Sequence, residues 1–181
     1  MKATGIVRRI DDLGRVVIPK EIRRTMRIRE GDPLEIFVDN NGEVIFKKYS
    51  LIGELTPFAG QYAEVLYKVG EVAVIITDRD RVVASGGLPK KDVMDHRVTA
   101  KLENIMEQRK IYIKDKNTET AEIVVCEGFA KSAGIIVPVI SQGDVIGSVC
   151  TILSDENGFP IATDVKLASV AAEFLAKQME S

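Results

Sequence analysis

The first fifty residues most constrain what this chain can fold into, because they form a small unit that cannot bury a core by itself. Two β-prone runs, 3–10 and 15–18, flank a turn-forming segment at 11–14, which predicts a strand, a turn and a second strand. A unit of about fifty residues without a disulfide or metal ligands rarely folds alone. We therefore predict that residues 1–50 form a domain that dimerises, with the second chain supplying the missing core.

A short helix is expected after the second run. Pro19 cannot donate to a β-ladder but suits the first turn of a helix, so we predict a helix over 20–27. Ile22 and Met26 lie one turn apart and are expected to face inward. Three arginines are then left facing outward: Arg23, Arg24 and Arg27.

The remainder of this domain is predicted to be a hairpin. The Glu-Gly-Asp-Pro sequence at 30–33 ends the helix, and residues 34–38 alternate as a strand. Asn-Asn-Gly at 40–42 offers the positive backbone angles of a tight turn into a second strand over 44–48. We place the end of the domain near Tyr49.

Charge is divided unevenly along the chain. The net charge is −2, but residues 1–29 hold nine Lys or Arg against three acids, whereas residues 51–181 hold fourteen against nineteen. This asymmetry indicates a basic segment that meets a polyanion and an acidic remainder with another role. The alternative is a charged face that only keeps the surface solvated.

Residues 51–70 are predicted to be a linker helix. Their apolar positions recur every three or four residues, which is typical of a helix-pairing seam: Leu51, Leu55, Phe58, Tyr62, Val65 and Val69. Pro57 is expected to start a helix capped by Thr56. An amphipathic helix packed on its own domain has comparable weight.

Residues 71–181 alternate strands and helices, which predicts an α+β domain with an antiparallel sheet. Strands are expected at 72–77, 81–85, 111–114, 122–126, 134–140 and 145–153, and helices at 91–109 and 163–179. The last two strands are joined by the short turn 141–144, which favours an antiparallel hairpin. The closing helix has one apolar face: Val165, Ala168, Ala172, Leu175 and Met179.

Convergent catalytic groups are scarce, so we predict no enzyme, no cofactor and no metal site. His96 is the single histidine of the chain, which excludes a multi-histidine metal site and a conventional hydrolase triad. The Gly-Gly-Leu-Pro-Lys sequence at 86–90 lacks the glycine spacing of a phosphate-binding loop. We interpret it as a turn at the rim of a ligand pocket.

Composition favours an ordinary globular protein. The chain has 181 residues and 45% hydrophobic content, and its two cysteines, Cys126 and Cys150, lie in apolar runs as reduced core residues. No apolar run approaches the roughly 20 residues that span a bilayer, and the basic, polar start lacks the apolar core of a signal peptide. We expect a cytoplasmic protein that associates with the nucleoid and not with a membrane.

The run from Thr4 to Pro19, TGIVRRIDDLGRVVIP, followed by Glu21 to Thr25, closely resembles the AbrB family of bacterial transition-state regulators. Residues 32–36 and 47–49 extend the resemblance over the first domain. It implies a swapped-hairpin β-barrel in which two chains interleave their strands. The two-domain layout resembles that of a sporulation regulator of this family, which implies activation or repression of sporulation or developmental genes. Residues 71–181 resemble a GAF domain in layout, without the sequence signature of its cyclic-nucleotide-binding members.

The resemblance also implies which residues contact double-stranded promoter DNA: Arg8, Arg15, Arg23 and Arg24. Arginine's planar fork bonds a phosphate or a guanine edge bidentately and stays charged. Further support is expected from Lys2, Arg9, Lys20 and Arg27, although for Arg9, Arg27 and Arg29 a solvated or salt-bridged surface role has equal weight. Folding could bring the four arginines to one face, and dimer symmetry would double the set.

Three classes of function remain. The leading one is a transcription regulator that is a homodimer through the first domain and a homotetramer through the linker helix and the second domain. The second is an antitoxin-like partner protein, because AbrB-type folds also occur in toxin-antitoxin modules. The third is a sensor of an unknown small-molecule ligand, with DNA binding under ligand control.

Overall fold

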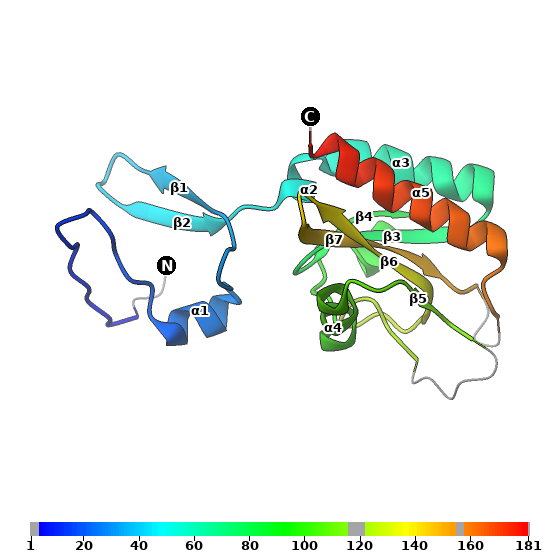
Figure 1. Ribbon diagram of the computed structural model, residues 1–181, viewed down its shortest axis with the longest axis horizontal. Helices are drawn as coiled ribbons and strands as arrows, with labels where there is room; N and C mark the ends of the chain where they lie inside the picture. The colour runs from blue at the N-terminus through cyan, green and yellow to red at the C-terminus, as the bar shows by residue number, and fades with distance from the viewer. Residues whose placement is uncertain (1–3, 116–121, 155–157, 181) are drawn as a thin grey trace. The chain divides into compact units, whose positions relative to one another are not determined.

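The computed structural model describes residues 4–115, 122–154 and 158–180. The chain divides into two compact units, residues 1–49 and 50–181. Figure 1 shows the two-stranded sheet of the first unit and the larger sheet of the second, each with its helices. No helix in the described part of the chain is long and apolar enough to cross a membrane.

The first unit contains one helix and one hairpin: α1 (Lys20–Met26), β1 (Leu34–Val38) and β2 (Val44–Lys48). The strands pair antiparallel from Leu34 opposite Lys48 to Val38 opposite Val44, and Gly42 takes a φ of 80° in the turn. The predicted helix and hairpin are confirmed. The helix ends one residue early because Arg27 adopts the left-handed conformation (φ 52°) and donates its N–H to the last-turn carbonyls.

The strands expected at 3–10 and 15–18 are absent from the described residues, so that prediction is wrong for the single chain. Backbone hydrogen bonds between the two runs are confined to the turn, where Asp11 N–H donates to the Arg15 carbonyl (3.0 Å) and Gly14 N–H to the Asp11 carbonyl (3.0 Å). An isolated two-stranded hairpin is marginal in water, because strands need further partners for their hydrogen bonds and apolar face. A single chain lacks such a partner for these runs.

The first unit has almost no core of its own. Pro19 is the one residue of its described part that is buried. Met26, which we expected to face inward, is 58% exposed, so this prediction is also wrong for the single chain. Large apolar side chains are exposed across the unit: Ile6, Val7, Ile10, Leu13, Val16, Val17, Met26, Ile36, Phe37, Val38, Val44, Phe46 and Tyr49.

The second unit is built on an antiparallel sheet of five strands in the order β4-β3-β7-β6-β5. Its strands are β3 (Ala73–Asp78), β4 (Val82–Gly86), β5 (Tyr112–Ile113), β6 (Ala133–Ser141) and β7 (Asp144–Ile152). The α+β class, the antiparallel sheet and the β6–β7 hairpin are confirmed. The expected strand at 122–126 is reduced to isolated bridges, in which Cys126 pairs with Val98 and Val124 with Ser132.

Both faces of this sheet are covered by a buried core. Neighbouring residues of β3 point to opposite faces, so Ile76 packs on one side with Leu175 and Ile75 on the other with Leu102. The first side is covered by α2 (Leu51–Glu54), α3 (Thr56–Gly70) and α5 (Ala162–Gln178), and the second by α4 (Ala100–Gln108). Figure 1 shows α3 and α5 along one side of the sheet and α4 on the other.

The helix expected at 91–109 is broken, which corrects that prediction. A short 3-10 turn, η1 (Lys90–Asp92), and α4 are separated by a segment that includes Asp95 at φ 61°. Val98 pairs with Cys126 in extended backbone, so the helix begins only after Thr99, whose hydroxyl accepts the Leu102 N–H. Pairing with a distant segment therefore overrides the local helical pattern.

The expected linker helix is two helices, α2 and α3, which belong to the second unit and pack against its sheet. Ser50 caps α2 by accepting the Gly53 N–H. The prediction that Thr56 caps α3 is wrong, because its hydroxyl instead donates to the Gly53 carbonyl. The buried face of α3 lies on its own sheet, so close to β4 that a Cβ on Gly86 would lie 2.1 Å from the Ala63 carbonyl oxygen. Of the two alternatives for residues 51–70, the amphipathic helix packed on its own domain therefore describes the buried face of α3.

Candidate nucleic-acid interface

The Asp11 carboxylate organises the turn that carries Arg15. One oxygen accepts the backbone N–H groups of Leu13 (3.0 Å) and Arg15 (2.7 Å), and the other lies 2.8 Å from Arg15 Nε. The backbone hydrogen bond from Arg15, followed by its side-chain bond, lowers the pKa of Asp11. Because this contact uses Nε and leaves the Arg15 side chain 69% exposed, the terminal nitrogens of the guanidinium remain accessible to a phosphate or a base edge.

Arg23 and Arg24 occupy the last turn of α1 and are both exposed. As consecutive helical residues they point in directions about 100° apart, so they cover different parts of the helix surface. Basic side chains are also favourable at this end of a helix, where the carbonyl groups carry partial negative charge. The helix thus presents two exposed guanidinium groups at its C-terminal end.

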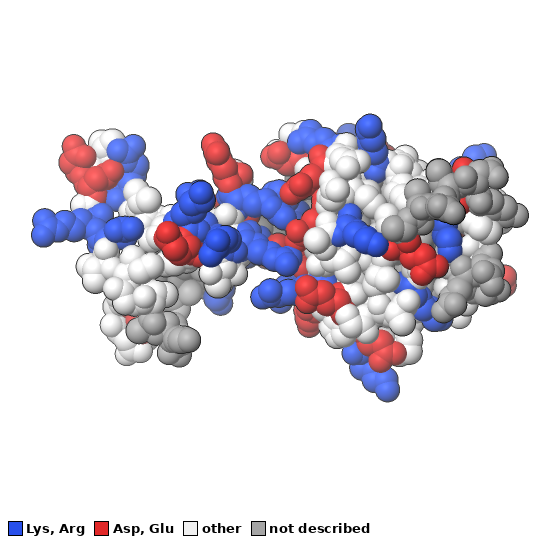
Figure 2. All heavy atoms as spheres, turned by 90° about the horizontal axis from the view of Figure 1, so that it is seen from below, with Lys and Arg blue, Asp and Glu red and all other residues white. Residues whose placement is uncertain are grey.

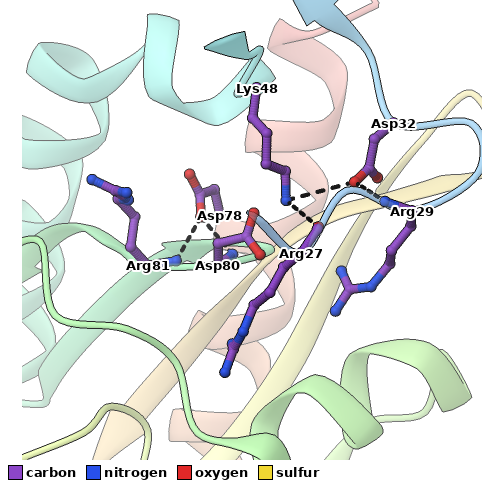
Figure 3. Close-up of polar contacts among 7 residues, drawn as sticks. All are labelled: Arg27, Arg29, Asp32, Lys48, Asp78, Asp80 and Arg81. Atoms are coloured by element: carbon purple, nitrogen blue, oxygen red, sulfur yellow. Dashed lines mark hydrogen bonds and ion pairs between the residues drawn. The ribbon is translucent and has the colours of Figure 1, made fainter. Parts of the chain in front are cut away.

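The C-terminal end of α1 is attached to the hairpin by a lysine that sequence reasoning did not identify. Lys48 Nζ donates to the Arg27 carbonyl (2.9 Å) and lies 3.5 Å from Asp32, which in turn accepts the Arg29 N–H (2.8 Å). The Asp32 side chain is 3% exposed. Figure 3 shows Lys48 reaching between Arg27 and Asp32. No local signal could have found this contact, because Arg27 and Lys48 are 21 positions apart.

The other predicted residues precede α1 in the chain or form its first residue. Arg8 and Arg9 are exposed on the extended run before the Asp11 turn and make no hydrogen bond or ion pair with any residue the structure describes. Lys20 is the exposed first residue of α1, and Lys2 lies outside the described residues. Arg23 and Arg24 therefore share one helix, whereas Arg15 and Arg8 lie on a separate turn and run.

The second unit has no comparable concentration of basic groups on the face shown in Figure 2, where acidic and basic side chains are intermixed. Its single histidine, His96, lies outside the helices and contacts the Glu127 carbonyl oxygen through Nδ1 (3.0 Å). Cys126 and Cys150 are free and buried, and burial raises their thiol pKa values to about 11 and about 12. Buried thiols with raised pKa values are inert, which agrees with their interpretation as reduced core residues.

A cavity of about 280 Å³ lies between α3 and β4. Its wall includes Ser85, Met94 and Lys90, the last residue of the turn at 86–90, and Lys90 Nζ lies 3.5 Å from Glu64. Gly87 takes a φ of 75° where the chain leaves β4 beside Tyr67. Of the turn that we expected at the rim of a pocket, Lys90 lines this cavity.

The two units match different sequence families. Residues 54–180 match the family described as stage V sporulation protein T C-terminal, transcription factor. Residues 7–51 match the family described as antidote-toxin recognition MazE, bacterial antitoxin. The second match covers the unit that carries the candidate DNA-contacting arginines.

Known proteins resemble both the whole chain and its parts. Stage V sporulation protein T of Bacillus subtilis is 48% identical over 180 residues, which cover 99% of each chain. Transition state regulatory protein AbrB of Bacillus subtilis is 63% identical over 49 residues, 27% of this chain and 50% of that protein. The crystal structure of the GAF domain of Acinetobacter phosphoenolpyruvate-protein phosphotransferase has a TM-score of 0.56 at 12% identity, and covers 74% of this chain and 84% of that one.

These comparisons confirm the AbrB-type resemblance of the first unit and the GAF fold of the second. The likeness to the Acinetobacter domain concerns the fold alone, because the identity is low. The likeness to the Bacillus subtilis sporulation protein extends over both units. The chain therefore belongs to the stage V sporulation protein T family of transcription factors.

Proposed function

We propose that this protein is a DNA-binding transcription regulator of sporulation genes with no catalytic role, and that Arg8, Arg15, Arg23 and Arg24 contact promoter DNA. The observation that carries the proposal is the exposure of these four arginines on the unit that is 63% identical to a transition state regulator. Arginines on a turn, a short helix and an extended run favour a broad surface that reads groove shape as well as bases. We therefore expect a relaxed sequence preference.

The proposed DNA-binding form is a dimer of the first unit. A domain whose described part buries one residue and exposes so much apolar surface needs a partner to hold its fold. A second copy that interleaves its strands would pair the extended runs 4–10 and 15–18 and cover the exposed apolar side chains. Two copies would present eight DNA-contacting arginines.

A further contact between second units would make the assembly a tetramer. Phe58 and Tyr62 of α3 stack on each other with ring centroids 6.3 Å apart, and both make tilted contacts with Phe174 of α5, at 5.6 and 5.2 Å. Beside this aromatic cluster, exposed valines extend an apolar surface over the same two helices: Val65, Val69 and Val170. An apolar surface of this kind suits helix pairing between copies. Light scattering at high concentration that finds only dimers would contradict the tetramer.

The DNA proposal is tested by Arg15→Ala and Arg23→Ala in electrophoretic mobility shifts with a promoter fragment. We expect both variants to lose binding while the oligomer persists in size-exclusion chromatography, because the two side chains are exposed and support no core. If all eight arginines of a dimer met phosphates, the logarithmic salt slope would be about −7. Retained binding by both variants at matched salt would refute the assignment.

The match of residues 7–51 to an antitoxin family keeps an antitoxin-like role as the alternative. The larger match, over residues 54–180, is to a transcription-factor family, and it favours the regulator. Genome-wide mapping of binding sites separates the two roles. A regulator occupies many promoters, whereas an antitoxin is expected mainly at the promoter of its own operon.

Ligand control is a second candidate function, favoured by the cavity between α3 and β4. The cavity of about 280 Å³ is close to the lower end of the roughly 300–1,000 Å³ range of small-molecule pockets, and its mixed lining includes Met94 and the ion pair of Lys90 and Glu64. A ligand that binds only the folded state raises apparent stability by mass action. A thermal-shift panel of metabolites, repeated with Gly60→Trp to fill the cavity from a position where an added Cβ meets no atom within 4 Å, tests this role.

A further inference from the structure

Two arginines of the second unit, Arg81 and Arg97, lie directly opposite each other in an antiparallel bridge beside the edge strand β4. The flanking hydrogen bonds run from Val98 N–H to the Asp80 carbonyl (2.9 Å) and from Val82 N–H to the His96 carbonyl (3.0 Å). Such a pattern makes the two arginines a non-hydrogen-bonded pair, the type in which side chains lie closest, with Cα atoms about 4.5 Å apart. Their side chains leave the backbone on the same face.

Among the residues that the structure describes, neither guanidinium has a partner of opposite charge. Both residues are exposed, and neither side chain makes a hydrogen bond or ion pair with any residue the structure describes. The nearby Asp78 accepts the backbone N–H groups of Asp80 and Arg81 through Oδ1, each at 2.7 Å, and makes no ion pair with either guanidinium. Figure 3 shows the Arg81 side chain extending away from Asp80. Two like charges placed directly opposite each other repel, so the pair is unfavourable until an anion joins it.

The backbone holds both arginines in place. The Arg81 carbonyl accepts the Asp78 N–H (2.9 Å), which closes the turn before β4. The Arg97 carbonyl accepts the Glu127 N–H (2.8 Å), which fixes the opposite segment. Little backbone ordering is therefore needed when a ligand binds, and preorganisation of this kind raises affinity.

We infer that Arg81 and Arg97 form a binding site for a phosphate group. One guanidinium fork satisfies the two oxygens of a carboxylate, whereas a phosphate has enough oxygens to accept from two adjacent forks. The pair therefore selects phosphate over carboxylate. Both arginines belong to the second unit, and neither lines the cavity between α3 and β4. Its phosphate belongs either to a free phosphorylated ligand or to the backbone of bound DNA.

The test uses the full-length protein and inorganic phosphate. Line broadening of the ³¹P resonance at low ionic strength reports binding, and we expect a dissociation constant on the order of 1 mM. Arg81→Ala with Arg97→Ala is expected to weaken binding at least tenfold, and Arg81→Lys by less, because lysine keeps the charge but loses the fork. Lys166→Ala removes one exposed positive charge from α5 and is expected to bind as the wild type does.

A structural readout accompanies the binding assay. Without phosphate, the double variant is expected to melt at or above the wild-type temperature, because the substitutions relieve repulsion. With phosphate, only the wild type and Lys166→Ala are expected to gain stability. Absence of broadening with the wild-type protein, or equal broadening with the double variant, would overturn the proposal.

Promoter binding then identifies the source of the phosphate. If the double variant loses phosphate binding and also binds promoter DNA more weakly at matched salt, the site contacts the DNA backbone. If promoter affinity is unchanged, the site serves a free phosphorylated ligand. Because Arg15→Ala tests the first unit separately, failure of the phosphate site and failure of the DNA-binding proposal are distinguishable.

Discussion

The two units of this chain solve the problem of burying apolar surface in different ways. The second unit places helices on both faces of its sheet and buries adjacent β3 residues on opposite sides. The first unit buries Pro19 and leaves Val7 86% and Val38 74% exposed. The comparison teaches that a chain can encode one domain that is complete alone and a second whose core depends on another molecule.

The largest expected effect comes from the core of the second unit. Leu175 is fully buried, so Leu175→Ala is expected to destabilise this unit by about 2–5 kcal/mol through lost burial and the cavity left behind. Urea unfolding followed by far-UV circular dichroism measures the loss, and hydrogen exchange locates it. Exchange that accelerates equally in residues 4–49 would contradict the independence of the two units.

A smaller loss is expected at the contact that attaches α1 to the hairpin. Asp32→Ala removes the acceptor of the Arg29 N–H and the partner of Lys48, at an expected cost of about 1–3 kcal/mol. Hydrogen exchange of residues 20–30 measures the loosening of the helix. Asp12→Ala, an exposed acid in the same unit, is the matched control, and an equal effect there would show that Asp32 has no particular role.

The dependence of the first unit on a partner can be tested with Val38→Ala. In the single chain Val38 is 74% exposed, so the substitution would change stability very little. If a second copy covers this side chain, the loss of two carbon atoms costs about 1.6 kcal/mol of stability. Dilution then lowers the hydrogen-exchange protection of residues 4–49 further in the variant. Hydrogen exchange at two protein concentrations distinguishes the outcomes. No cost at either concentration would remove Val38 from the dimer interface.

Sequence reasoning succeeded where neighbours in the chain decide the structure. The Asn-Asn-Gly turn of β1 and β2, the short turn of β6 and β7, and the apolar face of α5 are local patterns, and all three were predicted. It failed at 91–109, because Val98 pairs with Cys126, which is remote in the sequence. It also failed at 3–10 and 15–18, where one chain does not supply the strand partners.

The candidate site was predictable to the same extent. Exposed arginines could be named from the sequence, and Arg15 and Arg23 are indeed exposed. The turn at Asp11 was predicted, but the contact of its carboxylate with the Arg15 side chain was not. Lys48 could not be found, because its contact with Asp32 depends on how the hairpin meets the helix. Contacts between side chains that are distant in sequence need the fold first.

The smallest expected effect concerns acid. Backbone hydrogen bonds lower the pKa of Asp11 and of Asp39, whose carboxylate accepts the Glu43 N–H in the hairpin turn. A group with a lowered folded-state pKa stabilises the fold above its unfolded value, near 3.8, and that stabilisation is lost as the pH falls through the lower folded value. Both turns of the first unit are therefore expected to weaken below about pH 4.

Asp11→Asn separates this effect from general acid unfolding. At pH 7 the variant is expected to be less stable than the wild type, because the amide binds the Arg15 guanidinium and the two backbone N–H groups less strongly than a carboxylate does. At pH 3 the difference is expected to shrink as the wild-type carboxyl takes up its proton. Urea titrations at both pH values measure it, with Asp12→Asn as the control. A difference that is the same at pH 3 and pH 7 would mean that the charge of Asp11 does not stabilise the Arg15 turn.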